Sequence, residues 1–287
     1  MQQAARAEPI DGRNRPRRLH SYFHAGTFPF WSIHLAAVGG VALCGFSLRG
    51  VGLAVGAYFV RMVLVTAAYH RYFSHRAFKT SRPFQLLLAL GAQSAGQKGV
   101  LWWAAHHRRH HRHSDAPADP HSVRQEGFWH AHVGWILLRQ YGPTNPRMIG
   151  DLLKFPELRF LNRAGVRHLP AVALATAFLA AAGVHGLVWG FLVSTVLLWH
   201  GTFAINSLAH VAGRRRFATG DDSRNSLALA ILTTGEGWHN NHHRYPSSAR
   251  QGFRWWEIDA TLYVLLLLEK LGLIWELRRP PRALACG

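Results

Sequence analysis

Cysteine is scarce in this chain of 287 residues. Only Cys44 and Cys286 occur, and no CxxC pair is present. We therefore expect neither a disulfide framework nor a thiolate metal site. Cys44 lies in an apolar run, where a free thiol usually packs like a small hydrophobic side chain.

Acidic residues are also few, with 14 Asp+Glu against 33 Lys+Arg. Such an excess of positive charge is typical of proteins that bind nucleic acid, anionic membrane surfaces or acidic ligands. Long apolar runs favour a membrane. Residues 28–47 and 51–69 each approach the ~20 residues that cross a bilayer, and 169–184 and 187–206 form a second pair. A nucleic-acid-binding module is disfavoured because it leaves these runs without a role and lacks a recognition motif.

The distribution of positive charge predicts the topology. Residues 71–167 contain 15 Lys+Arg, whereas the two short hairpin turns carry only Arg49. The positive-inside tendency then places the N-terminus, the central segment and the C-terminus in the cytoplasm. No cleavable signal is expected, because the basic start leads into an apolar run of full length. The compact length, with no fused electron-transfer domain in sight, favours a bacterial inner membrane over the endoplasmic reticulum.

The predicted fold is therefore an all-α integral membrane protein with four transmembrane helices in two hairpins and a cytoplasmic helical cap. Two shorter apolar stretches, at 83–95 and 256–275, are expected at the membrane interface. The predicted regions are a mobile basic N-terminus (1–25), a membrane domain (26–275) whose cap comprises 70–168 and 207–260, and a basic C-terminal tail (276–287).

Histidine is abundant, and eight of the 20 histidines fall into three clusters. These clusters are HRYFSH at 70–75, HRRHH at 107–111 and HNNHH at 239–243. On a helix, residues three and four apart share a face, so each HxxHH block can aim its first histidine and one of the later pair at the same point. Imidazole suits iron, zinc, copper or nickel, and eight donors exceed what one metal holds. The pattern predicts a two-metal site.

Iron accounts for this pattern better than zinc. A hydrolytic zinc site needs about three ligands and a carboxylate base, as in HExxH, and no such motif occurs. An all-nitrogen ligand set on iron can bind and reduce dioxygen, and within a membrane it would attack an unactivated C–H bond of a lipid chain. The histidines without partner spacing are expected to be structural; they are His20, His24, His34, His113, His130, His168, His185 and His200.

Several longer motifs now carry a family resemblance. They are HRYFSH at 70–75, HHRRHHRHSDAPADPHS at 106–122, GFWHAHVGWIL at 127–137, NSLAH at 206–210 and GEGWHNNHHRYP at 235–246. In this combination the chain resembles the membrane-bound fatty-acyl desaturases, in particular the stearoyl-CoA (delta-9) type, from about residue 28 to 260.

The resemblance implies two irons held by nine histidines and by one water that an asparagine orients. On this chain the implied ligands are His70, His75, His107, His110, His111, His210, His239, His242 and His243, with Asn206 for the water. Counting back from the ADPH motif at 118–121 selects His107 and not His106 as the first ligand of the second cluster. Asp119, Glu236 and Asn240 are implied as partners that orient imidazoles, or as turn and cap residues.

The reaction implied is the removal of two hydrogens from adjacent methylenes, which leaves a cis double bond and consumes dioxygen and two electrons. A separate ferredoxin or cytochrome b5 with its reductase would supply the electrons, steered by the basic face. Acyl-CoA is the first expectation for the substrate, with acyl carrier protein or an intact glycerolipid as alternatives, because Ala105 and His106 stand where the animal enzymes carry an Arg-Asp pair. The implied tunnel residues are Tyr58, Met62, Thr202 and Phe203, and the suggested carrier contacts are Gln97, Lys98 and Arg139.

Two other functions remain open at this point. A di-iron hydroxylase or ketolase acting on a lipid, sterol or carotenoid also carries three histidine clusters, although the ADPH, HVGW and NSLAH motifs favour a desaturase. A metal transporter is disfavoured, because its ligands should lie within the spanning helices along a permeation path. Arg61 interrupts the second apolar run, where a charge must snorkel, pair with a polar group or line a polar cavity. Snorkelling or pairing with a buried polar partner is favoured over a catalytic role.

Overall fold

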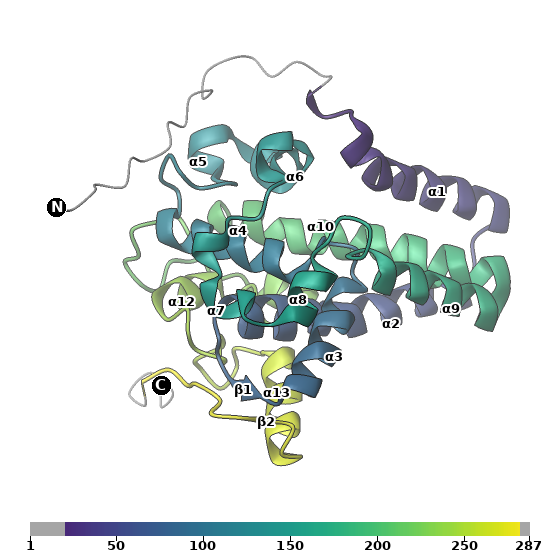
Figure 1. Cartoon of the computed structure of the whole chain (residues 1–287). Helices are drawn as coiled ribbons and strands as arrows, with labels where there is room; N and C mark the ends of the chain where they lie inside the picture. The colour runs from purple at the N-terminus through teal and green to yellow at the C-terminus, as the bar shows by residue number, and fades with distance from the viewer. Residues whose placement is uncertain (1–20, 282–287) are drawn as a thin grey trace.

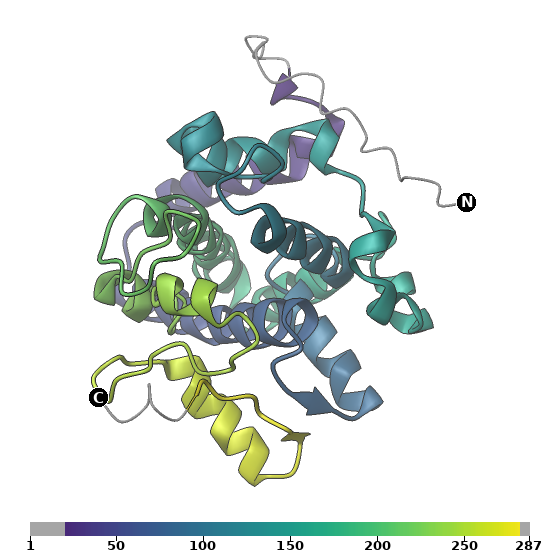
Figure 2. The same cartoon turned by 90° about the vertical axis from the view of Figure 1, so that its left-hand side faces the viewer.

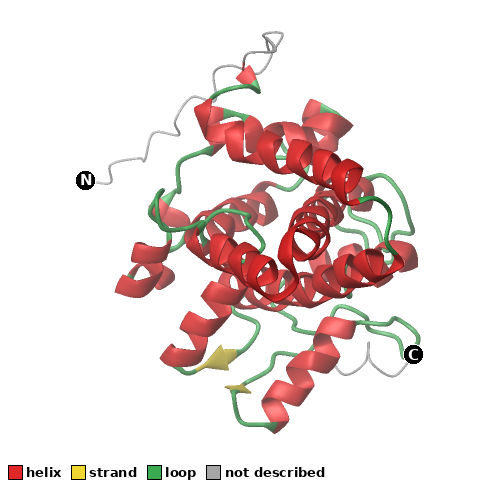
Figure 3. Ribbon diagram, turned by 90° about the vertical axis from the view of Figure 1, so that its right-hand side faces the viewer, coloured by secondary structure: helices red, strands yellow, loops and turns green. Residues whose placement is uncertain are grey.

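The computed structural model describes residues 21–281. The remaining residues, which include most of the predicted basic N-terminus, His20 and Cys286, lie outside the described part of the chain. Helices dominate, and the strands of the described part form a single two-stranded sheet (Figure 3). The prediction of a mostly helical membrane protein is confirmed in these coarse terms.

Within residues 21–281, three stretches are long and apolar enough to cross a membrane: Ala25–Cys44, Leu48–Ser74 and Leu169–His210. Their helices run side by side at the right of Figure 1, away from most of the shorter helices. The elements that form them are η2 (Ala25–Thr27) and α1 (Phe28–Cys44), α2 (Leu48–Leu64) and η3 (Val65–Ser74), then α9 (Leu169–His185), η7 (Gly186–Val193), α10 (Ser194–Ser207) and η8 (Leu208–His210).

The third stretch contains a chain reversal. Ala182 leaves helical geometry, and Gly183 adopts φ 61° and ψ −156°, a conformation that glycine reaches without the penalty of a Cβ. After the reversal Gly186 and Gly190 pack against Phe178, so close that a Cβ on Gly190 would lie 2.5 Å from its ring. The stretch therefore consists of two helical arms that pack on each other. Four separate crossings, as predicted from the sequence, stay a prediction.

Local sequence determines where the first two helices end and begin. Gly45, at φ 73°, closes α1 by donating its N–H to the Val41 carbonyl at 2.9 Å. Ser47 then caps α2 by accepting from the Gly50 N–H at 3.1 Å. The outer face of α1 is apolar, with Leu43 90% exposed. An apolar face of this kind is suited to contact with lipid.

Shorter helices gather at the left and centre of Figure 1. They are α3 (Arg82–Gln93), α4 (Val100–His113), α5 (Val123–Glu126), η4 (His130–Gly134), α6 (Trp135–Leu137), η5 (Arg139–Tyr141), η6 (Pro146–Met148), α7 (Gly150–Leu153), α8 (Pro156–Leu161), α11 (Leu227–Leu232) and α12 (His239–Arg244). Helix α13 (Ala260–Lys270) begins later than the predicted 256–275, because Asp259 caps it by accepting from the Leu262 N–H at 3.0 Å.

The C-terminal part of the chain is bonded back onto the rest. Strand β2 (Ile274–Trp275) pairs antiparallel with β1 (Lys79–Thr80). Arg278 then donates its backbone N–H to the Ala77 carbonyl, and its own carbonyl accepts from Ala249, each at 2.8 Å. In Figure 2 this region, in yellow, lies below the remaining helices. Some residues of the predicted tail from 276 thus belong to the folded unit.

Arg61 finds polar partners within the helical bundle. Its side chain is 3% exposed and donates to the hydroxyls of Ser194 at 3.0 Å and Thr195 at 2.9 Å. It also donates to the Ser94 carbonyl at 2.8 Å and lies over the Phe191 ring. Arg61 therefore pairs with buried polar groups, which is one of the alternatives that the sequence suggests for a charge at this depth.

Candidate metal centre

The nine predicted histidines come together in two clusters. The five-histidine cluster comprises His70, His75, His107, His111 and His242, and the four-histidine cluster comprises His110, His210, His239 and His243. Within each cluster one ring nitrogen of every member lies within 4.8 Å of all the others. The clusters are adjacent, since the rings of His111 and His243 lie 4.5 Å apart. This arrangement is what a two-metal site requires, and His106 has no part in it.

A π-helix accounts for the spacing of five in the first motif. In an α-helix of about 3.6 residues per turn, side chains five apart point in directions about 140° apart. Segment η3 is a π-helix, and the His75 N–H donates to the His70 carbonyl at 3.2 Å. The wider turn brings the His70 and His75 rings within 4.8 Å of each other. π-Helical turns recur at functional sites, and this one gathers two ring nitrogens.

The two HxxHH motifs cross between the clusters. On α4, His107 and His111 join the five-histidine cluster while His110 turns to the other. On α12 the assignment is reversed, because His239 and His243 join the four-histidine cluster and His242 turns away. In both motifs residues four apart share a face and the residue between them lies on the adjoining one. Each short helix therefore supports both clusters.

Ring nitrogens face one another at distances that call for a cation between them. The Nε2 atoms of His110 and His243 lie 3.4 Å apart, and the Nδ1 of each of these two rings lies against an aspartate. Where Nδ1 donates to a carboxylate, Nε2 of a neutral ring carries a lone pair. Facing lone pairs repel unless a proton or a metal ion lies between them. The donor set therefore fits a nitrogen-loving metal in each cluster.

Carboxylates hold three rings of the four-histidine cluster. The Nδ1 of His110 lies 3.0 Å from both Asp119 oxygens, and the Nδ1 of His243 lies 2.6 Å from Asp221. The Nδ1 of His210 lies 2.9 Å from an oxygen of Asp115. Such bonds fix the tautomer that points Nε2 at a metal and raise the basicity of the ligand. Asp119 is among the partners predicted from the sequence, whereas Asp115 and Asp221 are not.

One ring of the five-histidine cluster is held in the same way. The Nδ1 of His70 contacts the Glu236 carboxylate, which also accepts from Arg71 at 3.1 Å. Arg71 is itself buried and donates to Asp259 at 2.8 Å. Glu236, predicted from the sequence as an orienting partner, therefore belongs to a buried network of four charged or ionisable groups.

Asn240 acts on the neighbouring loop. Its side-chain oxygen accepts from the backbone N–H groups of Arg216 at 2.8 Å and Phe217 at 2.7 Å. Its amide donates to the Phe217 carbonyl. These bonds tie α12 to the loop that carries Asp221, so Asn240 positions a carboxylate. These contacts with loop backbone fit the cap or turn role, which is one of the two alternatives that the sequence leaves open for Asn240.

Burial sets the charge state of the rings. Burial and then the neighbouring rings hold the pKa values of His107 and His242 well below their ordinary range. His110 differs, because burial lowers its pKa but the Asp119 carboxylate raises it further, so that the net direction is upward. Neutral imidazole is the form that binds a metal. Because most of these rings are neutral, protons do not compete with a metal ion for their nitrogens.

Two cavities meet beside the clusters. A large one of about 490 Å³ and a small one of about 40 Å³ share Trp103, His107, Thr202 and Asn206 in their linings. Asn206, predicted to hold a water, thus lies where the cavities adjoin the histidines. The predicted tunnel residue Met62 lines the small cavity, and Phe203 lines the large one.

Tyr58 and the carrier residues take different positions. The Tyr58 hydroxyl donates to the Leu232 carbonyl at 2.8 Å and does not line either cavity. Gln97 and Lys98 line the large cavity, where Gln97 donates to the Thr202 hydroxyl at 3.0 Å. Arg139 is exposed on η5, outside that lining, and its carrier role stays a prediction.

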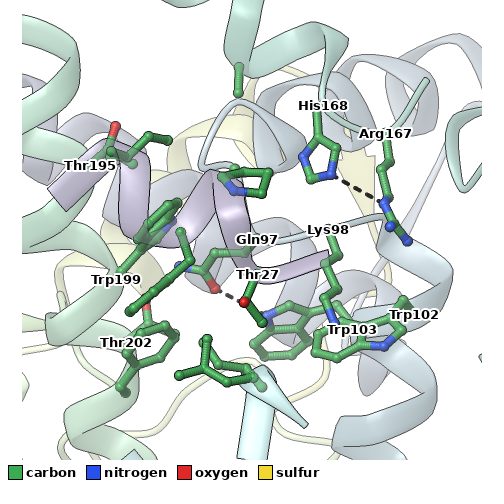
Figure 4. A pocket seen from close by; sticks show the side chains of 18 of the residues that line it. Thr27, Gln97, Lys98, Trp102, Trp103, Arg167, His168, Thr195, Trp199 and Thr202 are labelled. Carbon is green, nitrogen blue, oxygen red and sulfur yellow. Dashed lines mark hydrogen bonds between the residues drawn. The ribbon is translucent and has the colours of Figure 1, made fainter. Parts of the chain in front are cut away.

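Figure 4 reveals basic residues that the sequence did not single out. Arg167 and His168 lie on the same side of the large cavity as Lys98, while Thr195 lies across from them. The Arg167 Nε donates to His168 at 3.3 Å. In the sequence, the position of Arg167 and His168 directly before the apolar run 169–184 could have indicated them. The sequence predicts only an isolated structural role for His168.

Three further histidines form a chain of ring-to-ring contacts. His34 and His200 were expected to be structural, and His132 was given no role from the sequence. His34 on α1 contacts His200 on α10 at 3.1 Å, and His200 contacts His132 on η4 at 3.0 Å. The His132 ring continues to the Ser207 hydroxyl at 2.9 Å. A structural role for His34 and His200 agrees with this position, since the chain joins three elements beside the large cavity.

The fatty acid desaturase family model matches residues 48–266, a range that contains both histidine clusters. This chain belongs to the fatty acid desaturase family. It is accordingly an oxidoreductase, as the sequence predicted.

Relatives of this desaturase span several kinds of acyl carrier. The chain is 36% identical over 249 residues to an sn-1 stearoyl-lipid 9-desaturase of Anabaena variabilis, covering 86% of this chain and 90% of that one. It is 38% identical over 258 residues to a chloroplastic palmitoyl-monogalactosyldiacylglycerol delta-7 desaturase of Arabidopsis thaliana, covering 88% and 68%. It is 40% identical over 260 residues to an acyl-CoA 5-desaturase of Anemone leveillei, covering 86% and 79%.

Proposed function

We propose that this desaturase uses a histidine-ligated di-iron centre to insert a cis double bond into a saturated acyl chain. The observation that carries the proposal is the pair of adjacent imidazole clusters beside cavities whose lining is largely apolar. The proposed ligands are the nine clustered histidines, with Asn206 orienting a water. Iron is preferred because the reaction needs a redox metal and the donors are all imidazoles.

The overall reaction balances with an external electron source. A CH₂–CH₂ unit, dioxygen, two electrons and two protons give a CH=CH unit and two waters. Two irons held by the clustered histidines would supply the chemistry that reduces dioxygen and removes the two hydrogens. A separate ferredoxin or cytochrome b5 with its reductase is proposed to supply the electrons. The net charge of +19 supports an acidic donor of this kind.

The residues of this chain hold and shield the reacting centre. Asp115, Asp119, Asp221 and Glu236 fix the Nδ1 side of four rings, which leaves Nε2 free to bind metal. The bond between Gln97 and Thr202 crosses the lining of the large cavity near the shared residues, and we propose that it bends the acyl chain toward the metals. Apolar walls exclude water from the oxidising site.

Met62 is proposed to close the far end of the acyl path. Its side chain is 1% exposed and lines the small cavity, and a Cβ on Gly201 would lie 3.0 Å from its Cε. We expect Met62→Ala to lengthen this end and to shift the product profile toward longer acyl chains. Chain-length analysis of the products checks this. An unchanged preference, with the variant still folded and active, would contradict the assignment.

We also propose the position of the double bond, the membrane topology and the cellular location. The sequence motifs favour the delta-9 position, and the stearoyl-lipid 9-desaturase relative supports it, although other relatives are named for positions 5 and 7. We further propose four membrane crossings in two hairpins, with the histidine clusters on the cytoplasmic side. A bacterial inner membrane is the proposed location.

Expression in a desaturase-deficient host tests the function directly. Mass spectrometry of the fatty-acid methyl esters should show a new double bond at a single position and no added oxygen. His107→Ala and His242→Ala chains, expressed to the same level, should give no new unsaturation. An oxygenated product would instead identify a hydroxylase or ketolase, and activity retained in either variant would remove the proposed ligand set.

A further inference from the structure

The large cavity lies between the beginnings of two apolar stretches. Its lining includes Thr27, at the start of the first candidate span, and Arg167 and His168, directly before α9. Helices α1 and α9 flank it, and each of them packs on η7. Residues at the start of a spanning segment lie at the level of the lipid headgroups. The basic residues of the cavity therefore lie at that level.

These basic residues have no acidic partner. Neither Lys98 nor Arg167 forms an ion pair with a carboxylate in the part of the chain that the structure describes (residues 21–281). The Lys98 Nζ lies 4.1 Å from the centre of the Trp102 ring instead. Burial and then the Arg167 charge lower the pKa of Lys98 to about 8. Two cations that line the same cavity without a counter-charge are suited to an anionic group.

From this basic group the lining extends in two directions. One direction leads past Gln97 and Thr202 to His107 and Asn206, at the metal centre. The other follows α9 to Leu179, which is ten residues beyond Leu169 and about 15 Å along the helix at ~1.5 Å per residue. A ligand with one chain occupies only one of these directions, whereas a ligand with two chains can occupy both.

The second direction also reaches the outer surface of the helices. Of the lining residues on α9, Val172 is 56% exposed and Leu179 is 43% exposed. They lie within a candidate membrane span, so that lipid and not water is the medium outside them. The wall formed by α9 is thus shared between the cavity and the surrounding bilayer.

Resting on the proposed function, we propose that the acyl substrate is carried by an intact glycerophospholipid that enters from the bilayer between α1 and α9. Its phosphodiester binds Lys98, Arg167 and His168, one acyl chain passes Gln97 to the metal centre, and the other lies along α9. Charge-assisted bonds from the two cations give the headgroup its position. This carrier differs from coenzyme A, which the sequence puts first.

Photo-crosslinking of the purified full-length protein tests this directly. The probe is a phosphatidylglycerol with a diazirine in its sn-1 acyl chain, and the cross-linked peptides are mapped by mass spectrometry. We expect attachment within α1, α9 and α10, and competition by unlabelled dipalmitoyl-phosphatidylglycerol at concentrations at least about tenfold lower than palmitoyl-CoA requires. Equal or better competition by palmitoyl-CoA, or attachment only on the outer helix faces, would overturn the proposal.

Two pairs of variants give matched controls. K98Q combined with R167Q should weaken capture of the probe by about tenfold or more, the loss expected when charged hydrogen bonds are removed. R163Q, an exposed arginine outside the lining, should leave it unchanged. Ala175→Trp should fill the cavity and block capture, whereas Ala173→Trp on the exposed face should not. Equal capture within either pair would count against the site.

The assay also separates this proposal from the proposed function. Capture of the probe needs neither dioxygen nor an electron donor. Specific capture in a protein that forms no double bond would therefore support the lipid site and refute the function. Desaturation of palmitoyl-CoA together with capture that is insensitive to K98Q/R167Q would refute the lipid site and leave the function intact.

Discussion

The two histidine clusters differ in what holds the back of each ring. In the four-histidine cluster three of the four Nδ1 atoms contact an aspartate, and each aspartate is tied to backbone N–H groups of its own loop or of a neighbouring one. In the five-histidine cluster only His70 contacts a carboxylate, that of Glu236. The same carboxylate also accepts a hydrogen bond from Arg71. The buried Nδ1 of His242 has no partner in the described part of the chain. The four-histidine cluster is thus oriented by hydrogen bonds, and the other mainly by packing.

Removal of a single histidine ring should have the largest effect on activity. The loss of metal that accompanies it should differ between the two clusters. We expect both His75→Ala and His239→Ala to abolish double-bond formation. Metal content should fall further in His239→Ala, because three imidazoles remain there against four in the five-histidine cluster. Elemental analysis per purified chain checks this, with Arg163→Gln as a surface control. Full metal content in both variants would show that the clusters are not the metal sites.

Replacement of the orienting carboxylates comes next in size. Asp221→Asn should weaken metal binding at the four-histidine cluster by about 10–100-fold, the usual cost of losing such a partner, with little change in fold stability. Glu236→Gln should also lower the free energy of unfolding by about 1–3 kcal/mol, because Arg71 loses one of its two buried acidic partners. Chelator competition and thermal unfolding measure the two effects. Equal stability of the two variants would contradict the contrast.

In the metal-free protein, acid should set His110 against the buried rings of the five-histidine cluster. The pKa values of His75, His107 and His111 lie well below the ordinary value of 6.5, chiefly because of burial. Below about pH 6.5 the unfolded chain therefore takes up protons that the folded chain refuses, so the free energy of unfolding falls as the pH falls. His110 has the opposite sign, since Asp119 raises its pKa and favours the folded protein in acid.

Unfolding of the metal-free chain between pH 7.5 and pH 5 measures this balance. We expect a lower unfolding temperature at pH 5, and a steeper decline in His110→Asn, which loses the opposing contribution. A stability that rises on acidification would mean that the contribution of His110 outweighs that of the rings with lowered pKa values.

The smallest effect is expected from His106. This ring is buried and its Nδ1 contacts the Trp102 carbonyl at 3.0 Å, outside both clusters. Burial lowers its pKa to about 4, so it is neutral at physiological pH. His106→Phe should remove one hydrogen bond, worth about 0.5–1.5 kcal/mol, and leave the metal content unchanged. Loss of a metal in this variant would reverse the choice between His106 and His107.

The sequence was sufficient to find the histidines but only two of the four carboxylates that hold them, Asp119 and Glu236. His107 could be separated from His106 by counting from the ADPH motif, and the geometry brings His107 into a cluster. Asp115 and Asp221 could not be recognised, because a hydrogen bond to a ring 95 or 22 residues away leaves no mark in local spacing. The π-helix of η3 was equally hidden, since no simple periodicity distinguishes it from an α-helix.

The fold was predicted in the same partial way. Apolar length identified the long helices, because a run of about 20 apolar residues matches the thickness of a bilayer and is seldom found elsewhere. The C-terminal strand was not anticipated, since pairing of Lys79 with Trp275 depends on contacts nearly 200 residues apart in the chain. Arg61 could be recognised as needing a partner, but Ser194 and Thr195 become its partners only after the helices have packed.

The burial of Arg61 has a consequence for how the protein is made. A charge at the centre of a newly inserted helix costs about 2.5–3.5 kcal/mol. The hydroxyl of Ser194 that accepts from it lies 133 residues later in the chain. At about 5–20 residues per second, the ribosome needs about 7–27 s to reach that residue. During this interval only the Ser94 carbonyl, 33 residues after Arg61, is available among its permanent acceptors. The biogenesis machinery or transient water must therefore solvate the rest of the guanidinium until the second half of the protein arrives.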